Sequence, residues 1–191
     1  MNIQENHWLM KRTTLFSIFL ALSLFLSGCG VAQLTGSTTS TGSPAGGTPN
    51  WGVQTKTSGC VANNGLADTG CTPGAIFPDA TKDQICVSGY AGSVRNVPSS
   101  VKDQAYSEYG IASHSAGQYE VDHLVSLELG GSNDISNLWP ELASPQPGFH
   151  EKDKVENYLH TQVCSGAIAL QVAQVEIATN WLAVYQAMGG N

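Results

Sequence analysis

The stretch "YEVDHLVSLELGGSNDISNLWPE", residues 119–141, decides the fold because it joins two extended segments through a turn-forming loop. Its first part, YEVDHLV, is rich in Tyr and Val, which favour strands, and ISNLW at 135–139 is a second short extended segment. The Gly-Gly and Asn-Asp pairs between them are turn formers. The pattern predicts a hairpin with a wide loop, in which Asp122 and His123 interrupt an otherwise apolar strand.

Three helices are predicted around this hairpin. A short one lies in VPSSVKDQAYSEYG, with Ser99 or Ser100 as N-cap and Gly110 just after its end. Two longer ones lie in HEKDKVENYLHTQVCSG at 150–166 and LQVAQVEIATNWLAVYQAM at 170–188. Apolar residues recur on one face of each, at Val155, Leu159 and Val163 and at Ile177, Trp181 and Tyr185, which indicates core packing. The fold class is therefore predicted as α+β, a hairpin and helix within a small, mainly helical domain.

The N-terminus is typical of export. Residues 13–26 are an apolar run of signal-peptide length that follows Lys11 and Arg12. The LSGC that ends it resembles a bacterial lipobox, which implies a signal peptide at 1–28, lipid on Cys29 and attachment to the outer membrane or cell surface. An ordinary secretory signal is the alternative. The Gly/Ser/Thr-rich segment that follows predicts a tether at 29–59 and a folded domain at 60–188.

Four cysteines remain once Cys29 carries lipid: Cys60, Cys71, Cys86 and Cys164. In an oxidising compartment they predict two disulfides, and three pairings are possible. We favour Cys60–Cys71 around a Gly/Asn-rich loop, with Cys86–Cys164 joining the front of the domain to its C-terminal helices. A zinc site is the alternative, although no C-x-x-C pair occurs in the sequence.

The charge of the chain opposes nonspecific nucleic-acid binding. Removal of residues 1–28 takes one acid and two bases from the 15 and 8 of the whole chain, which leaves 14 and 6 and a net charge of −8. Duplex affinity comes from Lys and Arg that neutralise phosphates. An acidic chain must therefore supply positive charge locally or through a metal ion.

The polar residues of the hairpin and the next helix suggest hydrolytic chemistry. Asp122 and His150 are a carboxylate and an imidazole that could bind one divalent ion. His123 would then remain free as a general base, with the side-chain amide or backbone carbonyl of Asn137 fixing the orientation of its ring. Adjacent strand residues point to opposite faces, so Asp122 and His123 are expected to have separate roles.

The segment VDHLVSLELGGSNDISNLWPE, followed by a helix-borne His, resembles the HNH endonuclease motif. More of the chain is similar to small exported bacterial proteins described as HNH-nuclease-like. The resemblance implies a ββα-metal fold that hydrolyses phosphodiester bonds in nucleic acid. We favour DNA as the substrate, with RNA as the alternative. It implies Mg²⁺ as the cofactor, with Mn²⁺, Zn²⁺ or Ni²⁺ as alternatives. Asp122 matches the first metal ligand, His123 the base, Asn137 the base-orienting residue and His150 the last ligand.

A second hypothesis is an envelope lipoprotein that keeps this scaffold for binding or structure without turnover. The net charge favours it, as does a longer spacing from Asn137 to His150 than the common motif has. Lys152 and Lys154 are expected to be solvated and paired with Asp153 or Glu156 rather than to bind phosphate. For Arg95, a phosphate contact and a structural ion pair are both open.

Overall fold

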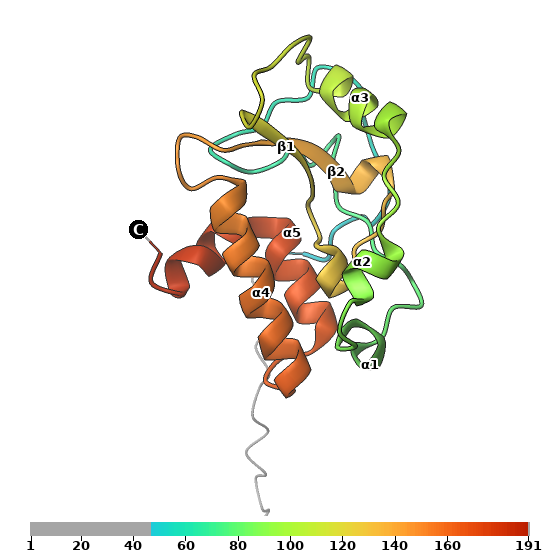
Figure 1. Cartoon of the computed structure of the whole chain (residues 1–191), viewed down its shortest axis with the longest axis vertical. Coiled ribbons are helices and arrows are strands. Elements are labelled where there is room, and N and C mark those ends of the chain that lie inside the picture. The colour runs from blue at the N-terminus through green and yellow to red at the C-terminus, as the bar shows by residue number, and fades with distance from the viewer. Residues whose placement is uncertain (1–46, 191) are drawn as a thin grey trace, which may run out of the picture. The chain divides into compact units, whose positions relative to one another are not determined.

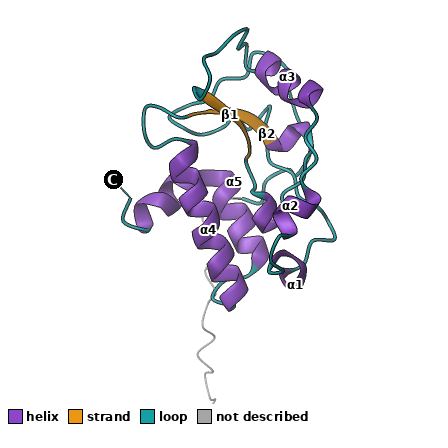
Figure 2. Cartoon of the chain, in the orientation of Figure 1, coloured by secondary structure: helices purple, strands orange, loops and turns teal. Residues whose placement is uncertain are grey.

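The computed structural model describes residues 47–190. The predicted signal peptide, Cys29 and most of the predicted tether lie outside this range. The described part combines five α-helices with a two-stranded antiparallel sheet, so the predicted α+β class is confirmed (Figure 2). The elements in chain order are α1 (Lys82–Ile85), α2 (Tyr90–Val94), α3 (Ser99–Glu108), β1 (Tyr119–His123), β2 (Leu138–Leu142), α4 (Phe149–Ser165) and α5 (Leu170–Ala187).

The predicted hairpin is formed by β1 and β2, which pair with Asp122 opposite Trp139 and His123 opposite Leu138. The second strand begins later than predicted, because Ile135–Asn137 form a 3-10 turn. The Asp134 carboxylate starts this turn by accepting a hydrogen bond from the Ser136 N–H at 2.9 Å. Local capping therefore overrides the strand preference of Ile135.

The loop between the strands folds back on β1 at Gly131. A Cβ built at this glycine would lie 1.8 Å from the carbonyl oxygen of Val125, so only glycine fits. The approach closes a backbone hydrogen bond from the Gly131 N–H to Ser126 O at 2.9 Å. The glycine pair thus shapes the loop, as the sequence predicted.

The N-cap of helix α3 lies one or two residues earlier than predicted. Ser99 is its first residue and Pro98 is the N-cap, without a side-chain capping bond, so the prediction of Ser99 or Ser100 as cap was wrong. Proline has a fixed φ that suits the residues around a helix start. The end was predicted correctly, because Gly110 follows Tyr109 with a φ of +68°.

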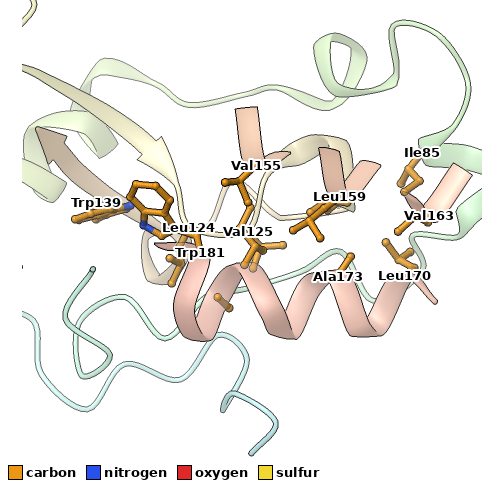
Figure 3. Close-up of a cluster of buried hydrophobic side chains, with 13 residues drawn as sticks. Ile85, Leu124, Val125, Trp139, Val155, Leu159, Val163, Leu170, Ala173 and Trp181 are labelled. Atoms are coloured by element: carbon orange, nitrogen blue, oxygen red, sulfur yellow. The ribbon is translucent and has the colours of Figure 1, made fainter. Parts of the chain in front are cut away.

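Helices α4 and α5 pack side by side and carry the core (Figures 1 and 3). The predicted faces are confirmed, since Val155, Leu159 and Val163 are buried together with Ile177 and Trp181, and Tyr185 packs at the edge. Trp139 of β2 is also buried and joins the hairpin to this cluster. The hairpin and α4 are thereby held in a fixed relation, which positions the polar residues between them.

Both favoured disulfides are present. Cys60–Cys71 closes the N-terminal loop, and Cys86–Cys164 joins the end of α1 to α4. Such bonds persist in oxidising compartments, which indicates an extracytoplasmic location. None of the helices among residues 47–190 is long and apolar enough to cross a membrane.

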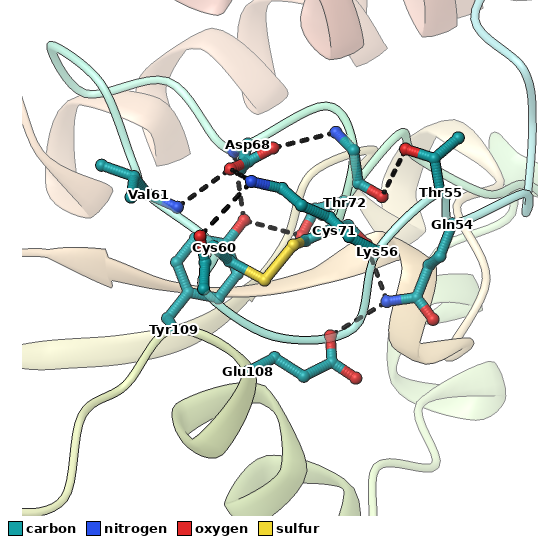
Figure 4. Close-up of a disulfide and its surroundings, with 12 residues drawn as sticks. Gln54, Thr55, Lys56, Cys60, Val61, Asp68, Cys71, Thr72, Glu108 and Tyr109 are labelled. Atoms are coloured by element: carbon teal, nitrogen blue, oxygen red, sulfur yellow. Dashed lines mark hydrogen bonds and ion pairs between the residues drawn. A yellow bond between two sulfur atoms is a disulfide. The ribbon is translucent and has the colours of Figure 1, made fainter.

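The ordered domain starts before Cys60. Lys56 makes an ion pair with Asp68 at 2.7 Å, next to the Cys60–Cys71 bond (Figure 4). The Gln54 amide donates to Cys71 O at 2.8 Å and to the Glu108 carboxylate at 2.9 Å. The predicted tether therefore extends too far, because its last residues are fixed by polar contacts that composition does not reveal.

Candidate functional site

The end of β1 places Asp122 and His123 in different surroundings, as strand geometry requires. The Asp122 carboxylate reaches Lys152 of α4, whereas the His123 ring reaches Asn133 of the hairpin loop. The His123 side chain is buried, with 2% of its surface exposed. The strand thus carries one charged group toward α4 and one imidazole toward the loop.

Asn137 is fully buried and holds the hairpin loop in place. Its Oδ1 accepts from the N–H groups of Ala75 at 3.2 Å and Val125 at 2.9 Å. Its Nδ2 donates to Val125 O and Ser132 O. These four bonds use the whole amide, so Asn137 does not orient the His123 ring. Its backbone carbonyl accepts from the Leu124 N–H at 2.8 Å, not from the imidazole.

The amide that orients His123 is Asn133. Asn133 Nδ2 donates to Val94 O at 2.8 Å, so its Oδ1 faces the Asn96 N–H at 3.0 Å and His123 Nε2 at 3.2 Å. An oxygen acceptor at Nε2 requires the proton of the neutral ring to be on Nε2. The lone pair of the imidazole therefore lies on Nδ1.

The His123 imidazole is neutral at ordinary pH. Burial lowers its pKa to about 4, and this effect outweighs the nearby Asp122 carboxylate, which raises it. The charges of Arg95 and Lys152 lower the pKa further. A neutral imidazole with a defined tautomer can accept a proton at Nδ1.

Lys152 is the cation of the Asp122 side of the hairpin. Its side chain is fully buried, with 0% exposed, and Nζ donates to Asp122 Oδ2 at 2.7 Å and to His123 O at 2.8 Å. A third bond joins Nζ to Glu156 Oε1, one turn along α4. The expected pairing with Glu156 is confirmed, but the expectation that Lys152 is solvated was wrong. Lys154 is exposed and pairs with Glu151.

A second carboxyl group, Glu141 of β2, is buried near Asp122, and among the described residues neither of its oxygens has a hydrogen-bond partner. Burial, followed by the charge of Asp122, raises the pKa of Glu141 well above its usual range, which favours the neutral carboxyl group. Burial alone would also raise the pKa of Asp122, but the Lys152 ammonium outweighs it and lowers that pKa. Asp122 is therefore an ionised carboxylate whose oxygens accept hydrogen bonds from the His123 N–H and from Lys152.

His150 lies at the start of α4, exposed, with its ring centroid 4.2 Å from that of Phe149. It belongs to no group of three possible ligands with Asp122 among the described residues. Both Asp122 oxygens already accept hydrogen bonds, Oδ1 from the His123 N–H at 2.8 Å and Oδ2 from Lys152. The residues present at Asp122 thus do not fit the divalent ion that the resemblance implies.

Within residues 47–190, one group of three side chains could hold a metal ion, namely Cys86, His160 and Cys164, whose ligand atoms lie within 4.8 Å of one another. The two sulfurs are joined in a disulfide, which provides no thiolate ligand. This group lies at the α1–α4 junction and includes none of the predicted ligands.

His123 opens onto a cavity of about 410 Å³ between β1 and α3. Arg95, Lys102, Tyr106 and Phe149 also line it. Three of the six cations in the described chain make no ion pair, namely Lys82, Arg95 and Lys102, and two of these line this one cavity. Glu120 lines the same cavity, so two cations and one carboxylate stand beside the neutral imidazole and the balance of charge there is positive.

Three residues of the site escaped prediction. Asn133 was interpreted only as a turn former, and Glu141 was given no role. The burial of Lys152 had a signal in the sequence, because Lys152 precedes Val155 and Leu159 by three and seven positions on the buried face of α4. A charged residue on an apolar stripe indicates a buried partner.

Comparisons of the chain with protein-family models, with curated proteins and with solved structures gave no match.

Proposed function

We propose that this protein is an exported hydrolase of phosphodiester bonds in nucleic acid, with His123 as general base. One observation carries the proposal. The neutral, oriented His123 ring opens onto a cavity that contains Arg95 and Lys102, two cations without carboxylate partners. A proton acceptor beside unpaired cations suits a substrate that is both anionic and attacked by water.

The chemistry uses one proton transfer and one displacement. His123 Nδ1 takes a proton from a water molecule as its oxygen attacks phosphorus. The bond from phosphorus to the leaving oxygen breaks, and that oxygen takes a proton from solvent. Arg95 and Lys102 bind the nonbridging phosphate oxygens and stabilise the charge that grows on them. DNA is the first polymer to test, followed by RNA.

The location of the activity follows from the N-terminal segment and the disulfides. The lipobox-like LSGC supports attachment through lipid on Cys29, and the two disulfides support a domain outside the cytoplasm. A tether before the domain would let it meet polymeric substrates near the envelope.

The test is a cleavage assay with the full-length chain in mild detergent, on plasmid, single-stranded DNA, RNA and bis(p-nitrophenyl) phosphate. The wild type should cleave at least one of them, and His123→Ala should lose about a hundredfold or more in rate. His114→Ala is the matched control, because His114 is an exposed histidine outside the cavity that contains His123. If wild type and His123→Ala are equally inert on all four substrates, with and without Mg²⁺ or Mn²⁺, the proposal fails.

A second candidate function is a noncatalytic envelope module that binds anionic polymers. It is favoured by the Asp122 side of the hairpin, where both oxygens of the Asp122 carboxylate already accept a hydrogen bond from the protein. This candidate expects oligonucleotide binding that weakens in Arg95→Gln and is unchanged in His123→Ala. Binding without cleavage by the wild type would select it.

A further inference from the structure

We propose that the ammonium group of Lys152 is a built-in cation, by which we mean that it occupies the position where the resemblance implies a divalent metal ion. The same group positions the backbone of His123. The inference about His123 rests on the proposed function, whereas the inference about the cation does not. Lys152 acts here as a positioning residue, because its ammonium touches Asp122 and His123 and is sealed from the cavity.

The first step is that every N–H donor of the Lys152 ammonium has an oxygen partner within the protein. An ammonium has three N–H donors, and Nζ directs them to Asp122 Oδ2, His123 O and Glu156 Oε1. The side chain is 0% exposed, so no water replaces any of these partners. Two carboxylates and one carbonyl are oxygen ligands of the kind that a hard cation prefers. The ammonium therefore occupies an oxygen-lined cation position.

The second step is that both oxygens of Asp122 are already engaged. Oδ1 accepts the His123 N–H at 2.8 Å, and Oδ2 accepts a hydrogen bond from Lys152 at 2.7 Å. An ion could bind only by expelling a buried ammonium from its three partners. His150, the other expected ligand, is exposed beside Phe149 and belongs to no three-ligand group with Asp122 in the described chain.

The third step concerns the base. The Asp122–Lys152 pair binds both polar backbone groups of His123, since Asp122 Oδ1 accepts its N–H and Lys152 Nζ donates to its carbonyl at 2.8 Å. Asn133 fixes the ring from the other side. Helix α4 thereby determines where the imidazole stands at the edge of the cavity. Loss of the ammonium should displace His123, and a small displacement of a reacting group has a large effect on rate.

The experiment measures Mn²⁺ capture by the full-length chain in mild detergent, from the loss of the free-ion EPR signal, together with Tm in EDTA and in Mn²⁺. Lys152→Met removes the charge and keeps an unbranched apolar side chain. Lys154→Met is the matched control, because Lys154 is exposed on the same helix and pairs only with Glu151. Wild type and Lys154→Met should have the same Tm in EDTA as in Mn²⁺ and leave the EPR signal intact.

Lys152→Met should capture one Mn²⁺ and rise in Tm with it, and Asp122→Asn in the Lys152→Met background should abolish both effects. The inference would be overturned if the wild type captured one Mn²⁺ and Asp122→Asn did not. This comparison tests the inference even if Lys152→Met does not fold. A folded Lys152→Met that captures no Mn²⁺ would also overturn it.

Cleavage assays separate this inference from the proposed function. Wild-type cleavage should survive EDTA, and Lys152→Met should lose about a hundredfold in rate while its KM stays within a few-fold of the wild type. Cleavage abolished by EDTA would overturn the built-in cation and leave the hydrolase standing. A wild type inert on every substrate would overturn the hydrolase, and Mn²⁺ capture would still test the cation.

Discussion

The two faces of β1 differ in how completely their polar groups are satisfied. On the α4 face, both oxygens of the Asp122 carboxylate accept a hydrogen bond, one from Lys152 and one from the His123 N–H, and the Lys152 ammonium is fully buried. On the α3 face, the His123 ring has one hydrogen-bond partner, Asn133, and lines a cavity with two unpaired cations. Enclosed polar groups stabilise a fold, whereas partly satisfied groups beside a cavity can act on a ligand. The difference favours His123 over Asp122 as the residue of the proposed chemistry.

The largest effect expected from this difference is on stability, at Lys152. Lys152→Met leaves the Asp122 and Glu156 carboxylates buried without their cation, which should cost about 3–5 kcal/mol in the free energy of unfolding. Lys154→Met should change it by less than about 0.5 kcal/mol, since Lys154 is exposed. Urea unfolding of the two variants measures this, and equal costs would refute the assignment of the α4 face as the enclosed one.

The next effect is the pH dependence from His123. An unfolded His takes up a proton near pH 6.5, whereas the folded pKa is about 4, so the unfolded state binds more protons between these values. The stability is fully present above pH 6.5 and should fall by about 3 kcal/mol as the pH drops toward 4.

The measurement is the difference in unfolding free energy between wild type and His123→Gln, followed from about pH 7 to 4, in which shared titrations cancel. His114→Gln is the control and should follow the wild type at every pH. A difference between wild type and His123→Gln that does not vary with pH would mean that His123 is solvated.

A smaller effect is expected at Asn133. Asn133→Ala removes the acceptor of His123 Nε2 and Asn96 N and the donor to Val94 O, and should cost about 1–2 kcal/mol. Asn137→Ala leaves four buried backbone groups without a hydrogen-bond partner and should reduce the free energy of unfolding by more than Asn133→Ala does. Only Asn133→Ala should change the ¹⁵N chemical shifts of the His123 ring while the domain stays folded. Unchanged shifts would show that another group fixes the tautomer.

The sequence predicted those features that depend on short-range pattern. The buried faces of α4 and α5 follow from four-residue spacing, and the strand at Asp122 follows from Tyr and Val. The hydrogen-bond partners of the polar side chains could not be predicted from the sequence, because they depend on the strand register and on how each helix is rotated about its axis. Asn133 and Asn137 lie four positions apart in one loop, and the 3-10 turn at Ile135–Asn137 decides which amide is buried and which meets His123. Lys152 is buried because α4 packs over β1.

The smallest effect expected concerns the cations of the open face. Arg95→Gln and Lys102→Gln should each weaken binding of a short oligonucleotide by about tenfold and reduce the slope of log K against log salt by about one. Lys82→Gln is the control, because Lys82 is the third unpaired cation and lies outside this cavity. Fluorescence anisotropy across a salt series measures both quantities. If Lys82→Gln matched the other two, binding would reflect total charge rather than the cavity, and the distinction between the two faces of β1 would concern stability alone.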